Sequence, residues 1–262
     1  MKNNAFIQQA AEYLKGGGLV AFPTETVYGL GADAFNPEAV AKIFEVKERP
    51  SFDPLIVHIS KLDDLNLLFE EVDDRVHKLA ETFWPGPLTI VKKKKITVPD
   101  IVTSGLSTVA VRMPANSIAL ELIEKAETPI AAPSANKFGM LSPTQAGHVK
   151  KQFPDLEHIL DGGPTSVGIE STVITLNPDG FELLRPGFIS EEEIEKVIPK
   201  STSAAKEMTL NSPGLLKSHY SPRKPLYIIG ETGINANTQN AGLISLTVPE
   251  SSLAYKYVEI LS

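Results

Sequence analysis

The sequence is a succession of short apolar segments, each of which ends in a polar loop rich in proline or glycine. Residues 19–22 form one such segment, closed by Pro23, and residues 55–59 and 108–113 have the same form. Short apolar runs of this kind are typical of buried β-strands, and the stretches between them carry apolar residues at helical spacing. The alternation predicts an α/β fold in which polar loops gather at strand ends.

The spacing of apolar residues and turn residues sets the expected elements. Strands are expected at residues 19–22, 55–59, 88–91, 108–113, 130–132, 159–161, 171–176 and 181–184. Helices are expected at residues 5–15, from 37 to before Pro50, and at 60–70, 73–83, 117–126, 143–153 and 190–197, with N-caps at Asn36 and Ser142. Asn177-Pro178-Asp179-Gly180 is a strong hairpin turn, so two strands must be antiparallel and the sheet mixed.

A change of composition after the last expected helix divides the chain. Residues 199–225 are rich in Ser, Thr, Lys and Pro and show no apolar periodicity, which predicts a linker. We expect a main domain at 1–198, the linker at 199–225 and a small α/β unit at 226–262, with strands at 226–230 and 243–248. That unit is shorter than domains that usually fold alone, so we expect it to be incomplete or to lean on the main domain.

Composition excludes several kinds of site. The chain has no cysteine, which removes thiolate nucleophiles, disulfides and sulfur-ligated metals. The net charge of −7 disfavours indiscriminate binding to nucleic acid or to anionic membranes. A polar N-terminus and the lack of a long apolar run predict a cytoplasmic protein without a membrane span.

The common nucleotide and hydrolase motifs are missing. Gly29-Leu30-Gly31 lacks the third glycine of a dinucleotide fingerprint, and the sequence contains no phosphate loop with Gly-Lys-Ser/Thr. Gly-x-Ser-x-Gly is absent, and no two histidines lie four residues apart. Serine and zinc hydrolases are therefore disfavoured.

Several polar loops follow strands instead. The loop at 23–31 contains hydroxyls, a carboxylate and two glycines, although its threonines could equally satisfy their own backbone. Similar loops occupy residues 132–136, 161–164 and 168–173. Because ligands of α/β proteins bind at strand ends, several such loops at one sheet edge predict a small-molecule site.

Three cations stand out near these loops. Lys47 and Arg49 flank the end of a helix, where Pro50 biases Arg49 away from helical geometry, and the pair suits a phosphate clamp. Arg112 ends an apolar strand and needs an anion, which could be a structural carboxylate or the carboxylate of a substrate. His58 shares a strand face with Ile56, a pattern more typical of a core residue than of a ligand.

A run of four lysines at 92–95 is the main sequence feature that suggests nucleic-acid binding. The run directly follows an expected strand and precedes Ile96 and Val98. We favour a solvated hairpin tip over a nucleic-acid site.

The motifs in order resemble those of the YrdC-type L-threonylcarbamoyladenylate synthases. The matching segments are 23–30, 47–50, 54–58, 84–89, 112–114, 133–136, 171–173 and 184–187. Ser212-Pro213-Gly214 and His219-Tyr220-Ser221-Pro222 are similar to the linker of the long form, which adds a small C-terminal domain. The resemblance implies a YrdC-like twisted mixed sheet flanked by helices, with a shortened C-terminal unit.

The resemblance also implies an activity. L-threonine, bicarbonate and ATP would give threonylcarbamoyl-AMP and pyrophosphate, with Mg²⁺ accompanying ATP. The product would pass to a threonylcarbamoyl-transferase complex that modifies tRNA beside the anticodon, with at most a weak contact between this chain and tRNA. Two alternatives are a module of the same fold that binds double-stranded RNA or tRNA, and a relative that handles carbamoyl groups.

Site residues follow position by position from the same resemblance. The threonine-binding residues would be Thr26, His58, Arg112 and Thr172. The ATP-binding residues would be Lys47, Arg49, Asp53, Thr108, Ser134, Asn136, Ser142, Arg185 and Tyr220, where Asp53 replaces an asparagine common in relatives. Catalysis would rest on Lys47, Arg49 and Arg112, by positioning and charge neutralisation. The resemblance assigns no metal ligands.

Overall fold

The computed structural model describes residues 2–202, 242–245 and 257–260. The chain divides into two compact units, Met1–Ser221 and Pro222–Ser262. The second unit, so far as it is described, contains β10 (Gly242–Ser245) and β11 (Tyr257–Ile260), which pair in parallel. The expected strand at 226–230 and most of the expected linker lie outside the described residues.

The first unit alternates helices and strands. Its helices are α1 (Lys2–Lys15), α2 (Pro37–Lys47), the 3₁₀ turn η1 (Leu62–Asp64), α3 (Leu65–Leu68), α4 (Asp74–Phe83), α5 (Asp100–Thr103), α6 (Ser117–Ala126), α7 (Ala146–Gln152) and α8 (Glu191–Glu195). Its strands are β1 (Val20–Phe22), β2 (Gly29–Asp33), β3 (Ile56–His58), β4 (Leu88–Lys93), β5 (Thr108–Arg112), β6 (Ile130–Ala131), β7 (His158–Ile159), β8 (Thr172–Asn177) and β9 (Gly180–Arg185).

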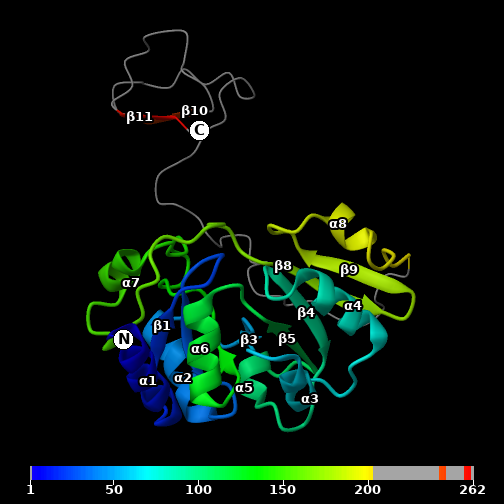
Figure 1. The fold of residues 1–262 in the computed structure, drawn as a ribbon, viewed down its shortest axis with the longest axis horizontal. Helices are drawn as coiled ribbons and strands as arrows, with labels where there is room; N and C mark the ends of the chain where they lie inside the picture. The colour runs from blue at the N-terminus through cyan, green and yellow to red at the C-terminus, as the bar shows by residue number, and fades with distance from the viewer. Residues whose placement is uncertain (1, 203–241, 246–256, 261–262) are drawn as a thin grey trace. The chain divides into compact units, whose positions relative to one another are not determined.

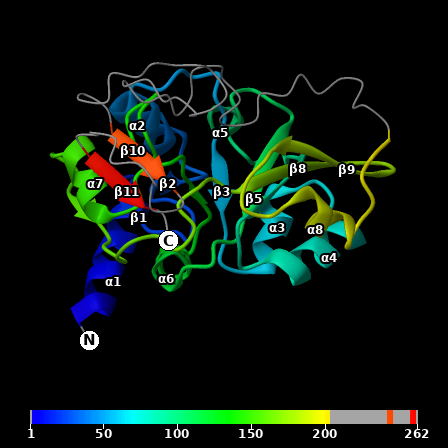
Figure 2. The same ribbon diagram turned by 90° about the horizontal axis from the view of Figure 1, so that it is seen from above.

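These nine strands form one mixed sheet in the order β7-β1-β2-β6-β3-β5-β4-β8-β9. Figure 1 shows β5, β4, β8 and β9 in one part of it. β1 pairs in parallel with β7, β3 with β5 and β4 with β8, while the other neighbours are antiparallel. The predicted hairpin is present at the sheet edge, where Asn177 pairs with Gly180, and Figure 2 shows β8 and β9 side by side with α8 nearby. The predicted mixed α/β sheet flanked by helices is confirmed.

Strand alternation sends side chains to two different cores. Ala21, Val57 and Val111 pack in the larger cluster with residues of α2, α3 and α4. On the other face, Val20 and Phe22 join the apolar sides of α1 and α6, which pack side by side (Figures 1 and 2).

Farther along that second face, a third cluster consists of strand residues, with no member from a described helix. It includes Ile56 on β3, Ala110 on β5 and Val173 on β8. His58 and Arg112 extend from the same face of β3 and β5, because they lie two residues beyond Ile56 and Ala110. This face of the sheet therefore carries polar side chains toward a pocket.

Local structure differs from the sequence expectation at β2 and at Ser142. β2 occupies Gly29–Asp33, part of which we expected to be loop, because two glycines gave the segment little strand character. Ser142 is not a helix cap: α7 starts at Ala146, and the Ser142 hydroxyl donates instead to Glu170, 2.9 Å away. By contrast, Asn36 caps α2 as expected, since its side chain accepts from the backbone of Glu38 and Ala39.

The lysine run is not a free hairpin tip. Lys92 and Lys93 lie on β4, where they form ion pairs with Asp73 and Glu70. Lys94 pairs with Asp100, and Lys95 donates to the carbonyl of Asn66. Each ammonium group is thus engaged locally in the main unit.

None of the described helices is long and apolar enough to cross a membrane.

Candidate functional site

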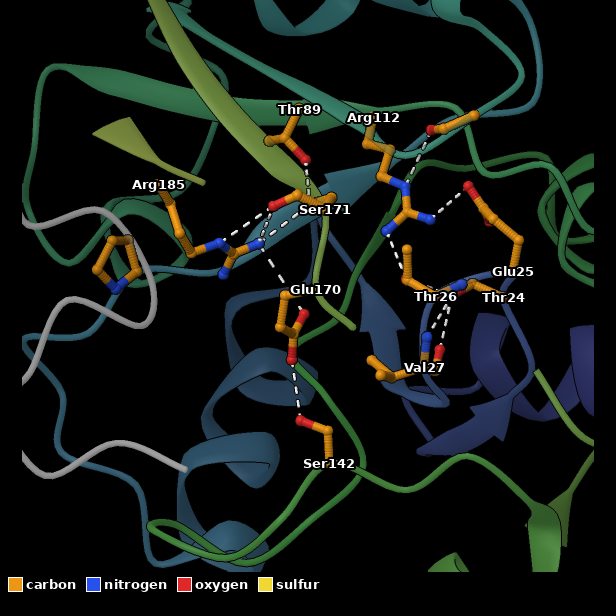
Figure 3. A network of polar contacts seen from close by, with 12 residues as sticks. Thr24, Glu25, Thr26, Val27, Thr89, Arg112, Ser142, Glu170, Ser171 and Arg185 are labelled. Atoms are coloured by element: carbon orange, nitrogen blue, oxygen red, sulfur yellow. Dashed lines mark hydrogen bonds and ion pairs between the residues drawn. The ribbon is translucent and has the colours of Figure 1, made fainter. Parts of the chain in front are cut away.

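A pocket opens where several loops meet the polar end of the second sheet face (Figure 3). The β1–β2 loop, β3, the end of β5, the segment after β6 and the start of β8 contribute to it. Its lining residues are Thr24, Thr26, Val27, Gly29, Arg49, Ile56, His58, Arg112, Ala132, Pro133, Ser134, Glu170 and Arg185. Three of them are arginines, which suits anionic ligands.

The threonines of the β1–β2 loop were expected either to satisfy their own backbone or to bind a ligand, and the structure shows how each is used. Thr24 satisfies its own loop: its hydroxyl donates to the Val27 carbonyl at 2.6 Å and accepts from the backbone N–H groups of Thr26 and Val27. The proton of Thr24 is thereby used, so the Thr26 hydroxyl donates to Thr24 and accepts from Arg112 at 2.9 Å. Both threonines line the pocket, but Thr24 closes the loop whereas Thr26 contacts Arg112.

Arg112 has a structural carboxylate partner and also lines the pocket. Its Nη2 lies 2.6 Å from Oε1 of Glu25, Nη1 donates to Thr26, and Nε donates to the Gly86 carbonyl. The other Glu25 oxygen accepts from the backbone N–H of Ala115 at 3.0 Å. These contacts use three of the five guanidinium N–H groups and fix its plane, leaving two for an incoming anion.

His58 lies beside Arg112, because the two residues are register partners on β3 and β5. The ring is buried and meets Phe22 edge to face at a centroid distance of 5.8 Å. Burial, together with the positive charge of Arg112, lowers the pKa of His58 from 6.5 to about 3. The imidazole is therefore neutral at physiological pH, and its Nδ1 has no hydrogen-bond partner within the described residues.

Arg49 is held where α2 ends. Glu48 adopts a left-handed conformation that ends the helix, so the chain turns and carries Arg49 to the pocket. There its Nη2 lies 2.8 Å from Oδ2 of Asp53, and it donates to the carbonyls of Asp53 and Pro54. Asp53 thus contacts the predicted clamp residue Arg49.

Lys47 lies deeper than a phosphate clamp requires. Its ammonium group donates to the carbonyls of Ser134, at 2.5 Å, and Asn136, and it is buried. Burial, and then the nearby Arg49 charge, lower the pKa of Lys47 well below its usual range. In this structure Lys47 fixes the loop after β6, which carries Ser134 into the pocket.

Arg185 lies at the end of β9 and is anchored to the start of β8. Its Nε and Nη2 donate to the Ser171 carbonyl, and Nη2 also donates to the Ser171 hydroxyl at 3.0 Å. The Ser171 hydroxyl is in turn 2.8 Å from that of Thr89. Glu170 lies between Arg185 and Ser142, as Figure 3 shows.

The remaining predicted site residues are placed differently. Thr108 begins β5 opposite Lys93, at the other end of the strand from Arg112, and does not line the pocket. Thr172 is buried at the start of β8 and donates to the Ile189 carbonyl at 2.7 Å. Asn136 is buried and donates to the carbonyls of Lys137 and Met140. Tyr220 lies outside the described residues.

Sequence reasoning missed two carboxylates at the site, Glu25 and Glu170. A signal for Glu25 existed: a buried arginine needs a counter-charge, and Glu25 is the carboxylate in the loop that follows the first strand. No comparable signal marks Glu170, because its partners come from loops distant in sequence.

Within the described residues, no three His, Asp or Glu side chains are grouped to hold a metal ion. Mg²⁺ that is bound together with ATP needs fewer protein ligands, because phosphates and water supply most of its ligands and the protein adds one or two carboxylates. Glu170, the carboxylate among the lining residues, fits that requirement.

Fold and site together define an α/β domain with an arginine-rich pocket for small anionic ligands. A family model named for Sua5, YciO and YrdC, with the description "Telomere recombination", matches residues 12–187. A second model, described as the C-terminal domain of threonylcarbamoyl-AMP synthase, matches residues 189–259. The chain belongs to the Sua5/YciO/YrdC family.

Similar proteins include curated enzymes and a solved structure. The threonylcarbamoyl-AMP synthase of Pyrococcus abyssi is 49% identical over 229 residues, which cover 85% of this chain and 67% of that protein. The Bacillus subtilis protein of the same name is 48% identical, with 86% and 67% covered. The structure of P. abyssi Sua5 complexed with L-threonine has a TM-score of 0.77 at 46% identity, covering 91% of this chain and 67% of that one. The chain thus spans about two thirds of the length of these relatives.

Proposed function

We propose that this chain is a threonylcarbamoyl-AMP synthase, which converts L-threonine, bicarbonate and ATP to threonylcarbamoyl-AMP, pyrophosphate and water. The observation that carries the proposal is Arg112, which lines the pocket with its plane fixed by Glu25, Thr26 and Gly86. A fixed guanidinium with two remaining N–H groups suits the carboxylate of an amino acid. The family includes a structure complexed with L-threonine, which supports this assignment.

The first chemical step needs threonine held with its amine exposed. In our proposal Arg112 binds the threonine carboxylate, and Thr26 and His58 flank the amino acid. The unprotonated amine attacks the carbon of bicarbonate, a C–N bond forms, and water leaves to give a carbamate. His58 is neutral at physiological pH, so it adds no positive charge beside the bound amino acid.

The second step joins the carbamate to the nucleotide. A carbamate oxygen attacks the α-phosphorus of ATP, and the bond from that phosphorus to the bridging oxygen breaks, so that pyrophosphate leaves with the electron pair. Arg49 and Arg185 neutralise phosphate charge and Ser134 positions the nucleotide, while Ser142 acts through its hydrogen bond to Glu170. Catalysis is then positioning and charge neutralisation, as in other phosphoryl and nucleotidyl transfers. Mg²⁺ supplies further neutralisation when bound.

Lys47 and Asn136 act in this proposal by holding the loop that carries Ser134. Asp53 acts through Arg49, to which it is paired. Thr108, Thr172 and Tyr220 have no step assigned to them.

Release of pyrophosphate from ATP tests the proposal. We expect release by the whole chain to require both L-threonine and bicarbonate. Omission of either should reduce the rate to background. Release that is unchanged without threonine would contradict the proposal.

Variants of Arg112 locate the activity in the pocket. Arg112→Lys keeps a charge beside Glu25 but loses the forked geometry, and should raise KM for threonine at least tenfold while KM for ATP stays within about twofold. Arg112→Ala leaves Glu25 buried without its charged partner, so circular dichroism must first show that the variant is folded. Glu195→Gln, on the exposed side of α8, is the control and should retain wild-type constants.

The wider role is also part of the proposal. The product is passed to a threonylcarbamoyl-transferase complex for tRNA modification, in the cytoplasm. If the chain binds RNA but releases no pyrophosphate from ATP, the RNA-binding module is favoured instead. Turnover with carbamoyl phosphate but not with threonine would favour a carbamoyl-handling relative.

A further inference from the structure

Glu170 is the carboxylate among the described residues that line an otherwise cationic pocket. The other two acids near the arginines are committed to them: Glu25 is 2.6 Å from Arg112, and Asp53 is 2.8 Å from Arg49. Neither Glu25 nor Asp53 lines the pocket, whereas Glu170 does. The role of Glu170 therefore differs from that of a simple counter-ion.

One carboxylate oxygen of Glu170 has no polar contact of hydrogen-bond length within the described residues. Oε1 accepts from the Ser142 hydroxyl at 2.9 Å, whereas Oε2 is 3.9 Å from Nη2 of Arg185, beyond hydrogen-bond distance. Arg185 is held by shorter bonds to Ser171, so Glu170 is not what fixes its position. Figure 3 shows the Glu170 carboxylate between Arg185 and Ser142.

A lone carboxylate among phosphate-binding groups has an electrostatic consequence. The triphosphate of ATP must lie close to Arg49 and Arg185, and hence close to Glu170, which would repel it. A divalent cation between carboxylate and phosphates reverses the sign of that interaction. Mg²⁺ characteristically binds through one or two carboxylates together with substrate phosphates and water.

We propose that Glu170 is the protein's carboxylate ligand to the Mg²⁺ that accompanies the nucleotide. In this assignment, which rests on the proposed function, Oε2 contacts the metal directly or through a bound water. The Ser142 hydroxyl holds the other oxygen and so orients the carboxylate.

Calorimetric titration of ATP into the whole chain tests the assignment without any turnover. The affinity is measured once with EDTA and once with saturating MgCl₂, for the wild type and for Glu170→Gln. We expect Mg²⁺ to strengthen ATP binding by the wild type, and Glu170→Gln to reduce that gain by about tenfold or more, as loss of a metal contact does. With EDTA, the variant should bind ATP more tightly than the wild type, because the repelling charge is gone.

Two control variants separate charge from geometry. Ser142→Ala removes the hydrogen bond but keeps the carboxylate, so Mg²⁺ should still strengthen binding substantially. Glu195→Gln makes the same charge change on the exposed side of α8 and should behave as the wild type.

The outcomes are distinct. If Glu170→Gln weakens ATP binding equally with and without Mg²⁺, Glu170 only positions Arg185 and Ser142, and the metal assignment is overturned. An unchanged effect of Mg²⁺ in the variant overturns it as well. If the wild type binds no ATP under either condition, it is the proposed function that fails.

Discussion

At the scale of single residues, the site rests on arginines that already have protein partners. The sequence left two anions open for Arg112, a structural carboxylate or a substrate carboxylate. The structure contains the first, Glu25, and Arg112 also lines the pocket. The two interpretations are therefore compatible, because the structural partner orients the guanidinium that binds the substrate carboxylate in the proposed function.

The buried His58 makes stability depend on pH. Its pKa is about 3 in the folded chain and 6.5 as an ordinary value. Above pH 6.5 the imidazole is neutral in both states. Between pH 6.5 and about 3 the unfolded state binds a proton that the folded state does not, so stability falls as pH falls, by up to about 1.4 kcal/mol per pH unit.

Urea unfolding at pH 8, 6 and 5 measures this contribution. We expect His58→Asn to lose stability more slowly than the wild type as the pH decreases below 6.5. The difference between the two free energies of unfolding should shift by about 1.4 kcal/mol from pH 6 to pH 5. Parallel curves for both proteins would show that His58 is protonated in the folded state. His58→Gln provides a second variant should the first fail to fold.

The residue types predicted that Arg112 needs an anionic partner, but they did not predict which residue provides it. An arginine ending an apolar strand required an anion, and the structure supplies Glu25 from a loop far away in sequence. The burial of Lys47 was not predictable, because it depends on two carbonyls of the loop after β6 rather than on any nearby side chain. Such contacts are set by strand order, which a local pattern does not contain.

At the scale of elements, Gly187 follows β9 and packs closely against the backbone at the start of β8. A Cβ at this position would lie 2.3 Å from the Thr172 nitrogen and 2.5 Å from the Ser171 carbonyl carbon. These are backbone atoms, so the backbone at the start of β8 or at Gly187 must shift. We expect Gly187→Ala to lower the free energy of unfolding by about 1–3 kcal/mol and to raise KM for ATP, since Arg185 is anchored to Ser171.

Gly147→Ala is the matched control. Gly147 lies in α7, and a Cβ there would meet nothing within 4 Å. Alanine is the better helix former, so this variant should be as stable as the wild type or more stable by up to about 1 kcal/mol. Urea midpoints and ATP kinetics of the two variants check the expectation. Equal stability of both would mean that the strands accommodate the methyl group.

Elements with caps and clear periodicity were predictable, and elements defined by pairing were not. α2 has its cap at Asn36 and its first-turn proline, and α8 has a capping box at Ser190. β2 has neither a β-branched side chain nor a clear period, and it is a strand because β1 and β6 pair with its two edges. Ser142 was expected to cap a helix, but the helix begins later and the hydroxyl serves the site.

At the scale of the whole molecule, the pocket collects residues from both ends of the main unit. Binding therefore stabilises the folded state against unfolding of the unit as a whole. With L-threonine at about 100 times its Kd, we expect a gain of about 2.7 kcal/mol, which corresponds to a rise in Tm of about 5–10 °C. Differential scanning calorimetry of the whole chain measures it.

L-valine is the matched ligand for this measurement, because it has the shape of threonine but lacks its hydroxyl. It should raise Tm by much less, and Arg112→Lys should reduce the rise with threonine. Equal shifts with both amino acids would show that the hydroxyl is not recognised. No shift with threonine at any concentration would contradict the threonine site.

The architecture as a class followed from the alternation of apolar segments, and the predicted hairpin made the sheet mixed. The order of the nine strands did not follow, because β3 and β5 are neighbours although β4 lies between them in sequence. That order brings His58 and Arg112 together. The boundaries of the linker and of the C-terminal unit stay predictions.

The carboxylates that lie near the pocket arginines have a consequence for how substrates arrive. Arg49, Arg112 and Arg185 face Asp53, Glu25 and Glu170, so their fields largely cancel at a distance, and the chain as a whole carries −7. Electrostatic steering of ATP and bicarbonate is then weak, and their encounter with the pocket depends on diffusion alone. Selectivity for anions arises only at close range, once a ligand reaches the N–H groups that the carboxylates leave exposed.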